Sequence, residues 1–320
     1  MVEMSRRCRR AAQIACAYMP PDDSQLVLRA QTVLYGHEPA QIWRLLQGVD
    51  AAARKAIDAG LLGRIEWALG DNTERPIFGS ADAGALNDAS SDALSDVTYE
   101  LFSKNFGSSG GHNRLAEGSP SDLLLILNPD TYPSPTVLVE LVGMLADSRI
   151  GLVEARQIPL EHPREYNLTT GTTSWASTCC VLIRRALFDQ LGGFDDEHFF
   201  LHCDDVDFSW RARKLGYLVV IAPHAVVFHD KRPTPEAAWP APDYELYHSA
   251  LGRLMLATRW DRPDIVDETI ASIEVGKSEV QLAALAEFRS RVADGRVPAP
   301  EQDARAVAQF IDGEYAVHRF

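Results

Sequence analysis

Residues 123–130, LLLILNPD, place a carboxylate directly after a run of five apolar residues. A continuous apolar run of this kind is typical of a strand that is buried on both faces of a sheet. A carboxylate at the end of such a strand is suited to a divalent cation, because these cations take oxygen ligands and bridge phosphates. The same residues also fit an Asx-type turn in which Pro129 fixes the backbone. The stretch therefore predicts a buried strand, followed by either a cation ligand or a structural turn at Asp130.

Strands and helices alternate on both sides of this stretch. Apolar runs predict further strands, and helical spacing of apolar residues predicts helices. The predicted strands span 26–35, 64–69, 97–102 and 150–155, and the predicted helices span 40–59 and 133–146. Residues 79–96 are rich in Ala, Ser, Asp and Gly and predict a loop. This alternation favours a doubly wound α/β sheet.

The second half of the chain has a different pattern. Residues 176–184, 217–221 and 225–229 predict three strands, and the chain becomes helical after about residue 235. Ligands of doubly wound sheets bind beyond the carboxyl ends of the strands. Two polar clusters stand at such ends, Gly70-Asp71-Asn72 and Asn128-Pro129-Asp130. That both clusters stand at strand ends is the first indication of a binding site.

The composition excludes several classes of protein. The 320 residues carry a net charge of −14, which argues against a nucleic-acid-binding protein and against broad electrostatic attachment to anionic lipid. The five cysteines form no CxxC pair, so we expect buried thiols in a reducing compartment. No apolar run reaches the roughly 18 residues of a membrane span. Residues 1–24 resemble a signal peptide, but their apolar patch is too short, and we expect an N-terminal extension instead.

A second stretch, LHCDDVDFSWRARKLGY at 201–217, gathers three carboxylates, Asp204, Asp205 and Asp207, at the start of a predicted helix. Acids in a first helical turn complement the helix dipole, and one of them is a good N-cap. Because like charges repel, this structural explanation covers one or two acids better than three. An ionised carboxylate at a rigid helix start can also act as a general base.

A lone histidine, His229, ends the run Ala225-Val226-Val227-Phe228. Such a histidine is more often a partly exposed side chain, although a neutral imidazole can complete a metal site with a carboxylate. The residues alone leave both interpretations open.

The order of these motifs resembles the inverting family 2 glycosyltransferases of the GT-A fold, and especially bacterial rhamnosyl- and galactofuranosyltransferases. The resemblance is carried by GDNT (70–73), KNFGSSGGHN (104–113), LLLILNPD (123–130), SWASTCCVLIRR (174–185), GGFDDEHFFLHCDDVDFSWRARKLGY (192–217) and AVVFH (225–229). It implies a Rossmann-like, mixed α/β sheet flanked by helices, with a helical C-terminal extension. The expected division is an extension at 1–24, a GT-A region at 25–235 and a helical region at 236–320.

The resemblance also implies roles on the side of a nucleotide-sugar donor. Asp130 matches the metal-binding acid of a DxD-like motif, with Asn128 at its first position, and His229 matches the histidine that completes the site for Mg²⁺ or Mn²⁺. Asp71 matches the acid that holds a pyrimidine base, and Tyr35, Asn105 and Asn113 are implied to lie near the nucleotide.

On the acceptor side, the resemblance implies that Asp205 is the general base, with Asp204 beside it and Trp175 among the acceptor contacts. The implied reaction moves a rhamnose- or galactofuranose-type sugar from a dTDP- or UDP-sugar to a cell-surface glycan or glycolipid. This reaction implies a cytoplasmic enzyme, with the inner face of the membrane as an alternative place of action.

Two departures motivate a different class of function. Gly36 stands where the resembled family usually has an asparagine, and position 128 supplies an amide in place of a second acid. The alternative is therefore a non-catalytic GT-A-like protein that binds nucleotide sugars or scaffolds an assembly. For residues 236–320 we expect packing on the core, with self-association or peripheral contact with a membrane as alternatives.

Overall fold

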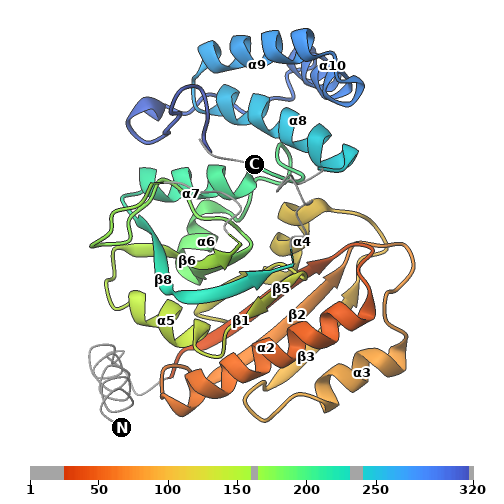
Figure 1. Cartoon of the computed structure of the whole chain (residues 1–320), viewed down its shortest axis with the longest axis vertical. Coiled ribbons are helices and arrows are strands. Elements are labelled where there is room, and N and C mark those ends of the chain that lie inside the picture. The colour runs from red at the N-terminus through yellow and green to blue at the C-terminus, as the bar shows by residue number, and fades with distance from the viewer. Residues whose placement is uncertain (1–24, 160–164, 231–240, 317–320) are drawn as a thin grey trace.

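The computed structural model describes residues 25–159, 165–230 and 241–316, so the predicted extension at 1–24 lies outside the described residues. Its centre is an eight-stranded sheet with the order β3-β2-β1-β4-β7-β6-β8-β5 (Figure 1). The strands are β1 (Val27–Leu34), β2 (Arg64–Asp71), β3 (Asp96–Leu101), β4 (Leu123–Leu127), β5 (Thr131–Pro133), β6 (Ile150–Ile158), β7 (Cys180–Arg184) and β8 (Leu218–His229).

The sheet is mixed, as the resemblance implies. Strand β1 is parallel to both β2 and β4, whereas β7 is antiparallel to β4 and to β6. The apolar run Leu123–Leu127 forms β4 with every residue buried. The carboxyl ends of β1, β2 and β4 therefore meet at one edge of the sheet, as the sequence predicts for Asp71 and Asp130.

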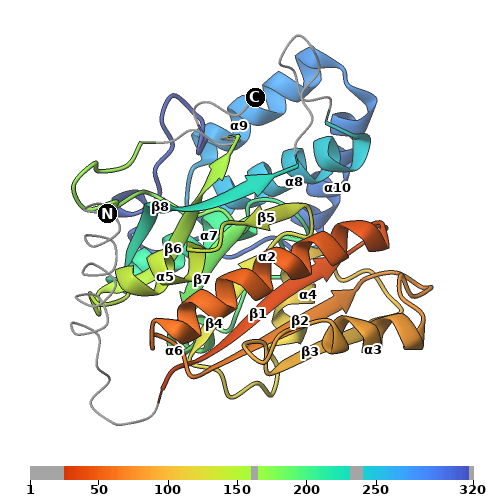
Figure 2. The same ribbon diagram turned by 60° about the horizontal axis from the view of Figure 1, so that its bottom comes forward.

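Helices cover both faces of the sheet (Figures 1 and 2). Apolar residues of α2 (Pro39–Asp58), α3 (Ser80–Asp88) and α5 (Val137–Met144) pack in one large core cluster with alternate residues of β1 and β4. Residues of α6 (Arg185–Leu191) and α7 (Asp204–Lys214) pack on the opposite face, as do those of α4 (Gly107–Ala116). Helix α2 begins sharply, because Glu38 and Gln41 form a capping box and Pro39 occupies the first turn.

Three local predictions are wrong. The predicted loop at 79–96 contains α3, since its Ala-rich sequence has enough helix propensity to form two turns. The predicted strands 217–221 and 225–229 form one strand, β8, which accommodates Pro223 at an irregularity in its pairing with β6. The predicted helix at 133–146 begins only at Val137, because Pro133 ends the short strand β5.

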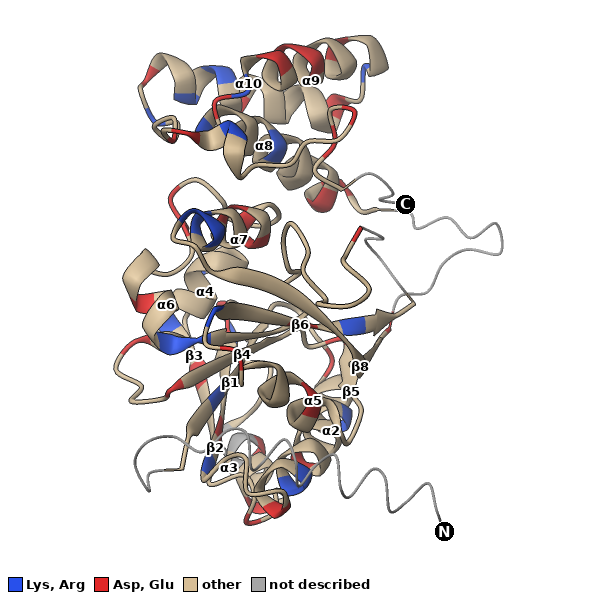
Figure 3. Cartoon of the chain, turned by 90° about the vertical axis from the view of Figure 1, so that its left-hand side faces the viewer, with Lys and Arg blue, Asp and Glu red and all other residues tan. Residues whose placement is uncertain are grey.

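Three helices, α8 (Asp243–Arg259), α9 (Pro263–Gly276) and α10 (Glu279–Ala293), form a layer above α7 (Figure 1). Acidic and basic residues are interspersed along the helices of this layer (Figure 3). Its inner side forms a second core cluster, in which Leu254 of α8 and Trp260, just after α8, join Val206 and Trp210 of α7. None of the helices in the described part of the chain is long and apolar enough to cross a membrane.

Candidate functional site

The sheet brings Asp130 and His229 into contact, although 99 positions separate them in the chain. Thr131 of β5 pairs with His229 of β8, so both strands present their ends at the same place. His229 Nε2 lies 3.1 Å from Asp130 Oδ2, and the two side chains are 2% and 27% exposed. The carboxylate therefore reaches solvent while the imidazole is held inside the protein.

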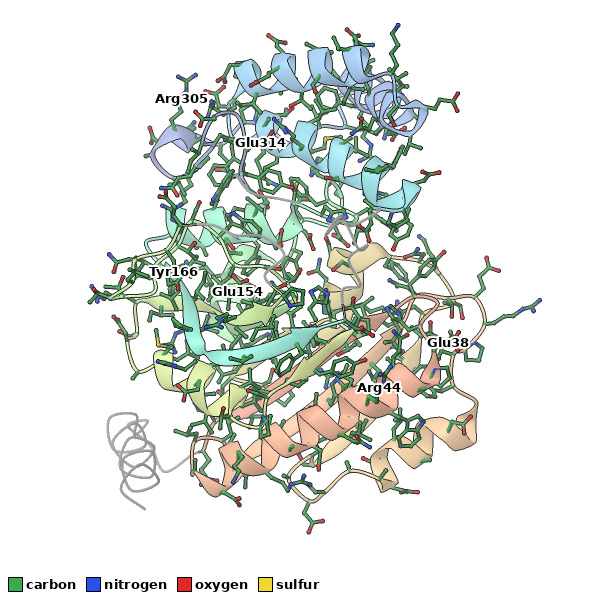
Figure 4. The ribbon with its side chains drawn as sticks, in the orientation of Figure 1. Glu38, Arg44, Glu154, Tyr166, Arg305 and Glu314 are labelled. Carbon is green, nitrogen blue, oxygen red and sulfur yellow. The ribbon has the colours of Figure 1, made fainter. Side chains whose placement is uncertain are left out.

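Two further polar side chains fix the orientation of His229. Gln157 Nε2 lies 3.3 Å from Glu154 Oε1 and donates to it, which leaves Gln157 Oε1 to face His229 Nδ1 at 3.2 Å. Glu154 lies on β6 in the middle of the molecule (Figure 4). Because an amide oxygen only accepts, Nδ1 carries a proton, and Nε2 faces the Asp130 carboxylate with room for a second proton or a cation between them.

This arrangement fits a divalent cation. A ligand histidine typically donates its other ring N–H to a fixed acceptor, as His229 does to Gln157. A lone pair facing a carboxylate needs a proton or a cation between them, and imidazole with carboxylate suits Mn²⁺ and similar ions. The described residues contain no group of three or more acidic, histidine or cysteine side chains that could hold a metal. Within the described residues, a cation at this place would have Asp130 and His229 as ligands and would take its other ligands from water or a bound molecule.

Residues 174–180 connect this pair to the acidic helix start. On one side, Asn128 N donates to Cys179 O at 2.9 Å, and Cys179 Sγ lies 3.5 Å from His229 Nδ1. On the other side, Ala176 N donates to Ser209 Oγ of α7 at 3.0 Å. One short segment therefore fixes the position of α7 relative to Asp130 and His229.

Asp204 is buried at the start of α7, with 3% of its surface exposed. Burial, and then the neighbouring charge of Asp205, raise the pKa of Asp204 to about 7. Ser109 Oγ makes a short hydrogen bond to Phe199 O and lies 3.1 Å from Asp204 Oδ2. Because a hydroxyl has one proton, a protonated Asp204 completes this network by donating to Ser109 while Ser109 donates to Phe199.

The three acids of the helix start have different surroundings. Asp205 is partly exposed, and its Oδ1 accepts from Val206 N at 2.8 Å. Asp207 is fully buried and accepts from Arg211 Nε at 2.7 Å and from Trp260 Nε1 at 3.2 Å. Asp207 therefore joins α7 to α8, Asp204 joins α7 to α4, and Asp205 is the carboxylate that reaches solvent.

Asp71, the predicted base-binding acid, is fully buried at the end of β2. Its Oδ1 accepts from Thr73 N at 3.0 Å, and its Oδ2 accepts from Ile77 N at 2.8 Å and from Tyr99 Oη. Burial, and then the hydrogen bond to Asp71, raise the pKa of Tyr99 to about 12. The carboxylate thus orders the loop that follows β2, and its role toward a base stays a prediction.

The three other predicted nucleotide contacts have different surroundings in the structure. Tyr35 is 61% exposed just after β1. Asn105 Oδ1 accepts from Gly107 N at 2.9 Å and shapes the entry to α4. The side chain of Asn113 donates to and accepts from the main chain of Phe194, at 2.8 and 2.9 Å. Asn113 therefore connects α4 to the turn before the acidic helix.

His37 was not among the predicted residues. Its Nδ1 accepts from Tyr35 N at 3.0 Å, which leaves Nε2 to carry the proton of the neutral ring. Burial lowers the pKa of His37, and the nearby charges of Asp130 and Asp71 oppose this effect. His37 is therefore close enough to both acids for their charges to raise its pKa. Its signal in the sequence is a polar residue just beyond the end of β1.

Trp175, the predicted acceptor contact, is 2% exposed in the second core cluster. Its Nε1 donates to Tyr315 O at 3.0 Å, and the two rings meet edge to face. The C-terminal segment thus covers this ring, and an acceptor contact of Trp175 stays a prediction.

Comparison of the whole chain with solved structures identifies the fold. The mannosyltransferase PcManGT of Pyrobaculum calidifontis, in complex with GDP-Man and Mn²⁺, superposes with a TM-score of 0.57 at 16% identity, covering 93% of this chain and 89% of the other. GalNAc-T7 with UDP, GalNAc and Mn²⁺ gives a TM-score of 0.60 at 14% identity, over 87% of this chain and 56% of the other. The chain has the GT-A glycosyltransferase fold.

Sequence comparison gives shorter matches to curated proteins. An N-acetylglucosaminyl-diphospho-decaprenol L-rhamnosyltransferase of Mycobacterium tuberculosis is 47% identical over 57 residues, 18% of this chain and 18% of the relative. The O-antigen biosynthesis protein RfbC of Myxococcus xanthus is 28% identical over 170 residues, 43% of this chain and 13% of the relative. No family model matches the chain. This GT-A protein thus resembles bacterial rhamnosyltransferases and spans about a fifth of the length of the first of these relatives.

Proposed function

We propose that the chain is an inverting glycosyltransferase that moves a sugar from a nucleotide-sugar donor to a glycan or lipid-linked acceptor. The observation that carries the proposal is the contact of Asp130 with His229 at the carboxyl edge of a GT-A sheet. The resemblance to a rhamnosyltransferase supports a deoxyhexose or furanose sugar on dTDP or UDP and a cell-surface acceptor assembled at the cytoplasmic face of the membrane.

Asp130 and His229 would hold the divalent cation, together with oxygens of the donor diphosphate. When bound, such a cation neutralises the charge that grows on the departing nucleoside diphosphate. Gln157, which is held by Glu154, orients His229 so that its Nε2 faces Asp130, where the cation would bind. We assign Asp71, Tyr35, Asn105, Asn113 and Asn128 to the donor side as the resemblance implies.

Asp205 would act as the general base. The acceptor hydroxyl gives its proton to the Asp205 carboxylate while its oxygen forms a bond to the anomeric carbon. The bond from that carbon to the diphosphate oxygen breaks on the opposite face, so the configuration inverts. Because Asp204 stays protonated up to about neutral pH, it would leave Asp205 as the ionised member of the pair facing the acceptor.

The proposal is tested with purified protein, a panel of dTDP-, UDP- and GDP-sugars, and Mg²⁺ or Mn²⁺. A donor that binds the folded protein raises its melting temperature, and released nucleoside diphosphate reports turnover. We expect Asp205→Asn to abolish transfer and to keep donor binding, whereas Asp189→Asn, at an exposed site on α6, keeps both. Full activity of Asp205→Asn would show that the base is assigned wrongly.

The second candidate is a non-catalytic GT-A protein that binds nucleotide sugars as a scaffold. It is favoured by the pair of protein ligands at Asp130 and His229, which is a small set for a metal. Metal-dependent turnover of any donor rejects this candidate, whereas donor binding without turnover in the presence of acceptor supports it.

A further inference from the structure

A cavity of about 280 Å³ lies between the loop before α7 and the C-terminal helices. Its volume is just below the roughly 300–1,000 Å³ of sites that bury drug-sized ligands. It therefore suits a small unit such as one sugar ring. Its wall consists of residues 196–201 of the loop, of residues from α8 that include Tyr247 and His248, and of Arg291 from α10.

The position of the cavity separates it from the donor side. Neither Asp71, Asp130 nor His229 lies in its wall. The loop residues of the wall lead directly into Asp204 and Asp205. Asp204 and Asp205 themselves are not in the wall, whose loop residues end at Leu201, three positions before Asp204. The cavity therefore lies on the loop that leads into the acidic helix start and carries none of the donor-side acids.

The loop is held firmly against α4. Ser108 N donates to Phe200 O at 2.9 Å, and Ser109 Oγ donates to Phe199 O. A Cβ at Gly107 would lie 2.1 Å from Phe200 O, so only glycine fits there. The part of the wall formed by Phe199 and Phe200 is thus a fixed surface, which is what recognition of a ligand requires.

The side chains of the wall match the two kinds of surface on a sugar. The rings of Phe200 and His248 stack on each other at 4.9 Å with an angle of 24°, and both belong to the wall, which gives it an apolar part suited to the C–H groups of a sugar. Burial, and then the charge of Arg291, lower the pKa of His248, so this ring is neutral near pH 7. The exposed carboxylates of Asp196 and Glu197 accept hydrogen bonds from hydroxyls, and the guanidinium of Arg291 donates them.

We propose that this cavity is an acceptor subsite that binds a sugar ring of the acceptor glycan, with Arg291 and His248 of the C-terminal helices as its specificity-determining residues. The inference rests on the proposed function, since an acceptor exists only for a transferase. It makes the C-terminal helices part of the active site rather than a support for it.

The test compares Arg291→Ala with Arg289→Ala. Both arginines lie on α10 and each forms one ion pair, Arg291 with Glu287 and Arg289 with Glu274. Because such pairs at a surface contribute little stability, both variants are expected to fold, and thermal unfolding checks this. Arg289 lies outside the cavity wall. Loss of a charged hydrogen bond to the acceptor is expected to raise the acceptor KM of Arg291→Ala about ten-fold and to increase the share of donor lost to water.

A second measurement needs no donor. Methyl glycosides of neutral hexoses and of 6-deoxyhexoses are titrated into the full chain, and binding is followed by ligand-observed NMR. We expect binding to wild type and Arg289→Ala, and loss of binding in Arg291→Ala and in His248→Ala.

The outcomes separate the two proposals. Unchanged acceptor KM in both Arg291→Ala and His248→Ala overturns the subsite while the transferase stands. Absence of donor turnover by wild type with the whole panel overturns the proposed function, and with it the acceptor role, even if the methyl glycosides bind. A change confined to Arg291→Ala and His248→Ala supports the subsite.

Discussion

The protonation of Asp204 gives a measurable prediction about stability. Its pKa is about 7 in the folded chain against an ordinary value of 3.8, a difference of about three pH units. One unit corresponds to about 1.4 kcal/mol, so keeping Asp204 ionised in the folded state costs up to about 4 kcal/mol. Asp204→Asn removes this cost, because the amide is neutral at every pH. The amide nitrogen of the substituted side chain can donate to Ser109 Oγ, which lies 3.1 Å from Asp204 Oδ2.

The sign follows from proton binding. Below pH 3.8 the carboxyl is protonated in both the folded and the unfolded chain, and its contribution to stability is fully present. As pH rises toward 7 the unfolded carboxyl ionises while the folded one does not, so wild type loses stability. The asparagine variant has no such loss. We therefore expect nearly equal stability at pH 4 and a gain of about 2–4 kcal/mol for Asp204→Asn at pH 8.

The assay is urea denaturation followed by tryptophan fluorescence at several pH values between 4 and 8. Asp189→Asn, at an exposed carboxylate, serves as the control and is expected to change stability by less than about 0.5 kcal/mol at every pH. A gain for Asp204→Asn that is the same at pH 4 and pH 8, or no gain at pH 8, would refute the protonated state of Asp204.

Three other predictions concern the fold, the donor and the cation. Gly107→Ala should destabilise the chain by more than about 3 kcal/mol in urea denaturation, because a Cβ would collide with Phe200 O. The control Gly118→Ala also has a positive φ but has open space around it, and it should cost about 1 kcal/mol. His37→Ala should raise the donor KM several-fold in steady-state kinetics, because the charges of Asp130 and Asp71 reach His37, and an unchanged KM would show that His37 does not contribute to donor binding. Asp130→Asn should abolish the Mn²⁺-dependent part of the donor-induced rise in melting temperature, and a variant that keeps this dependence would locate the cation elsewhere.

The sequence predicts well what depends on local pattern. The apolar run Leu123–Leu127 is β4 to the residue, and the position of Asp130 at its end follows directly. Where strand continuity or helix propensity depends on neighbours, prediction fails. Pairing with β6 keeps β8 extended on both sides of Pro223. Helix α3 forms in a segment whose composition alone indicates a loop.

For the candidate site, the sequence names residues but does not show the contacts between them. Asp130 and His229 meet as expected, but nothing in the local sequence shows that Gln157 orients the histidine, since that residue comes from a third strand. The separate surroundings of Asp204, Asp205 and Asp207 likewise depend on Ser109 and on Trp260, which lie far away in the chain. Burial and tertiary hydrogen bonds decide these roles, and neither is visible in residue spacing.

The backbone just before α7 has a consequence for protein engineering. His202 and Cys203 both adopt left-handed conformations, and Gly252 of α8 lies so close that its Cβ would be 3.1 Å from His202 O. Non-glycine residues hold such conformations only where surrounding structure enforces them. A chimera that carries the C-terminal helices of another transferase would lose the contact of Gly252 with His202. The backbone at His202 and Cys203 could then leave its left-handed conformation. The layer of C-terminal helices is thus not an exchangeable module, and recombination sites belong inside α8 to α10, away from the contact of Gly252 with the bend.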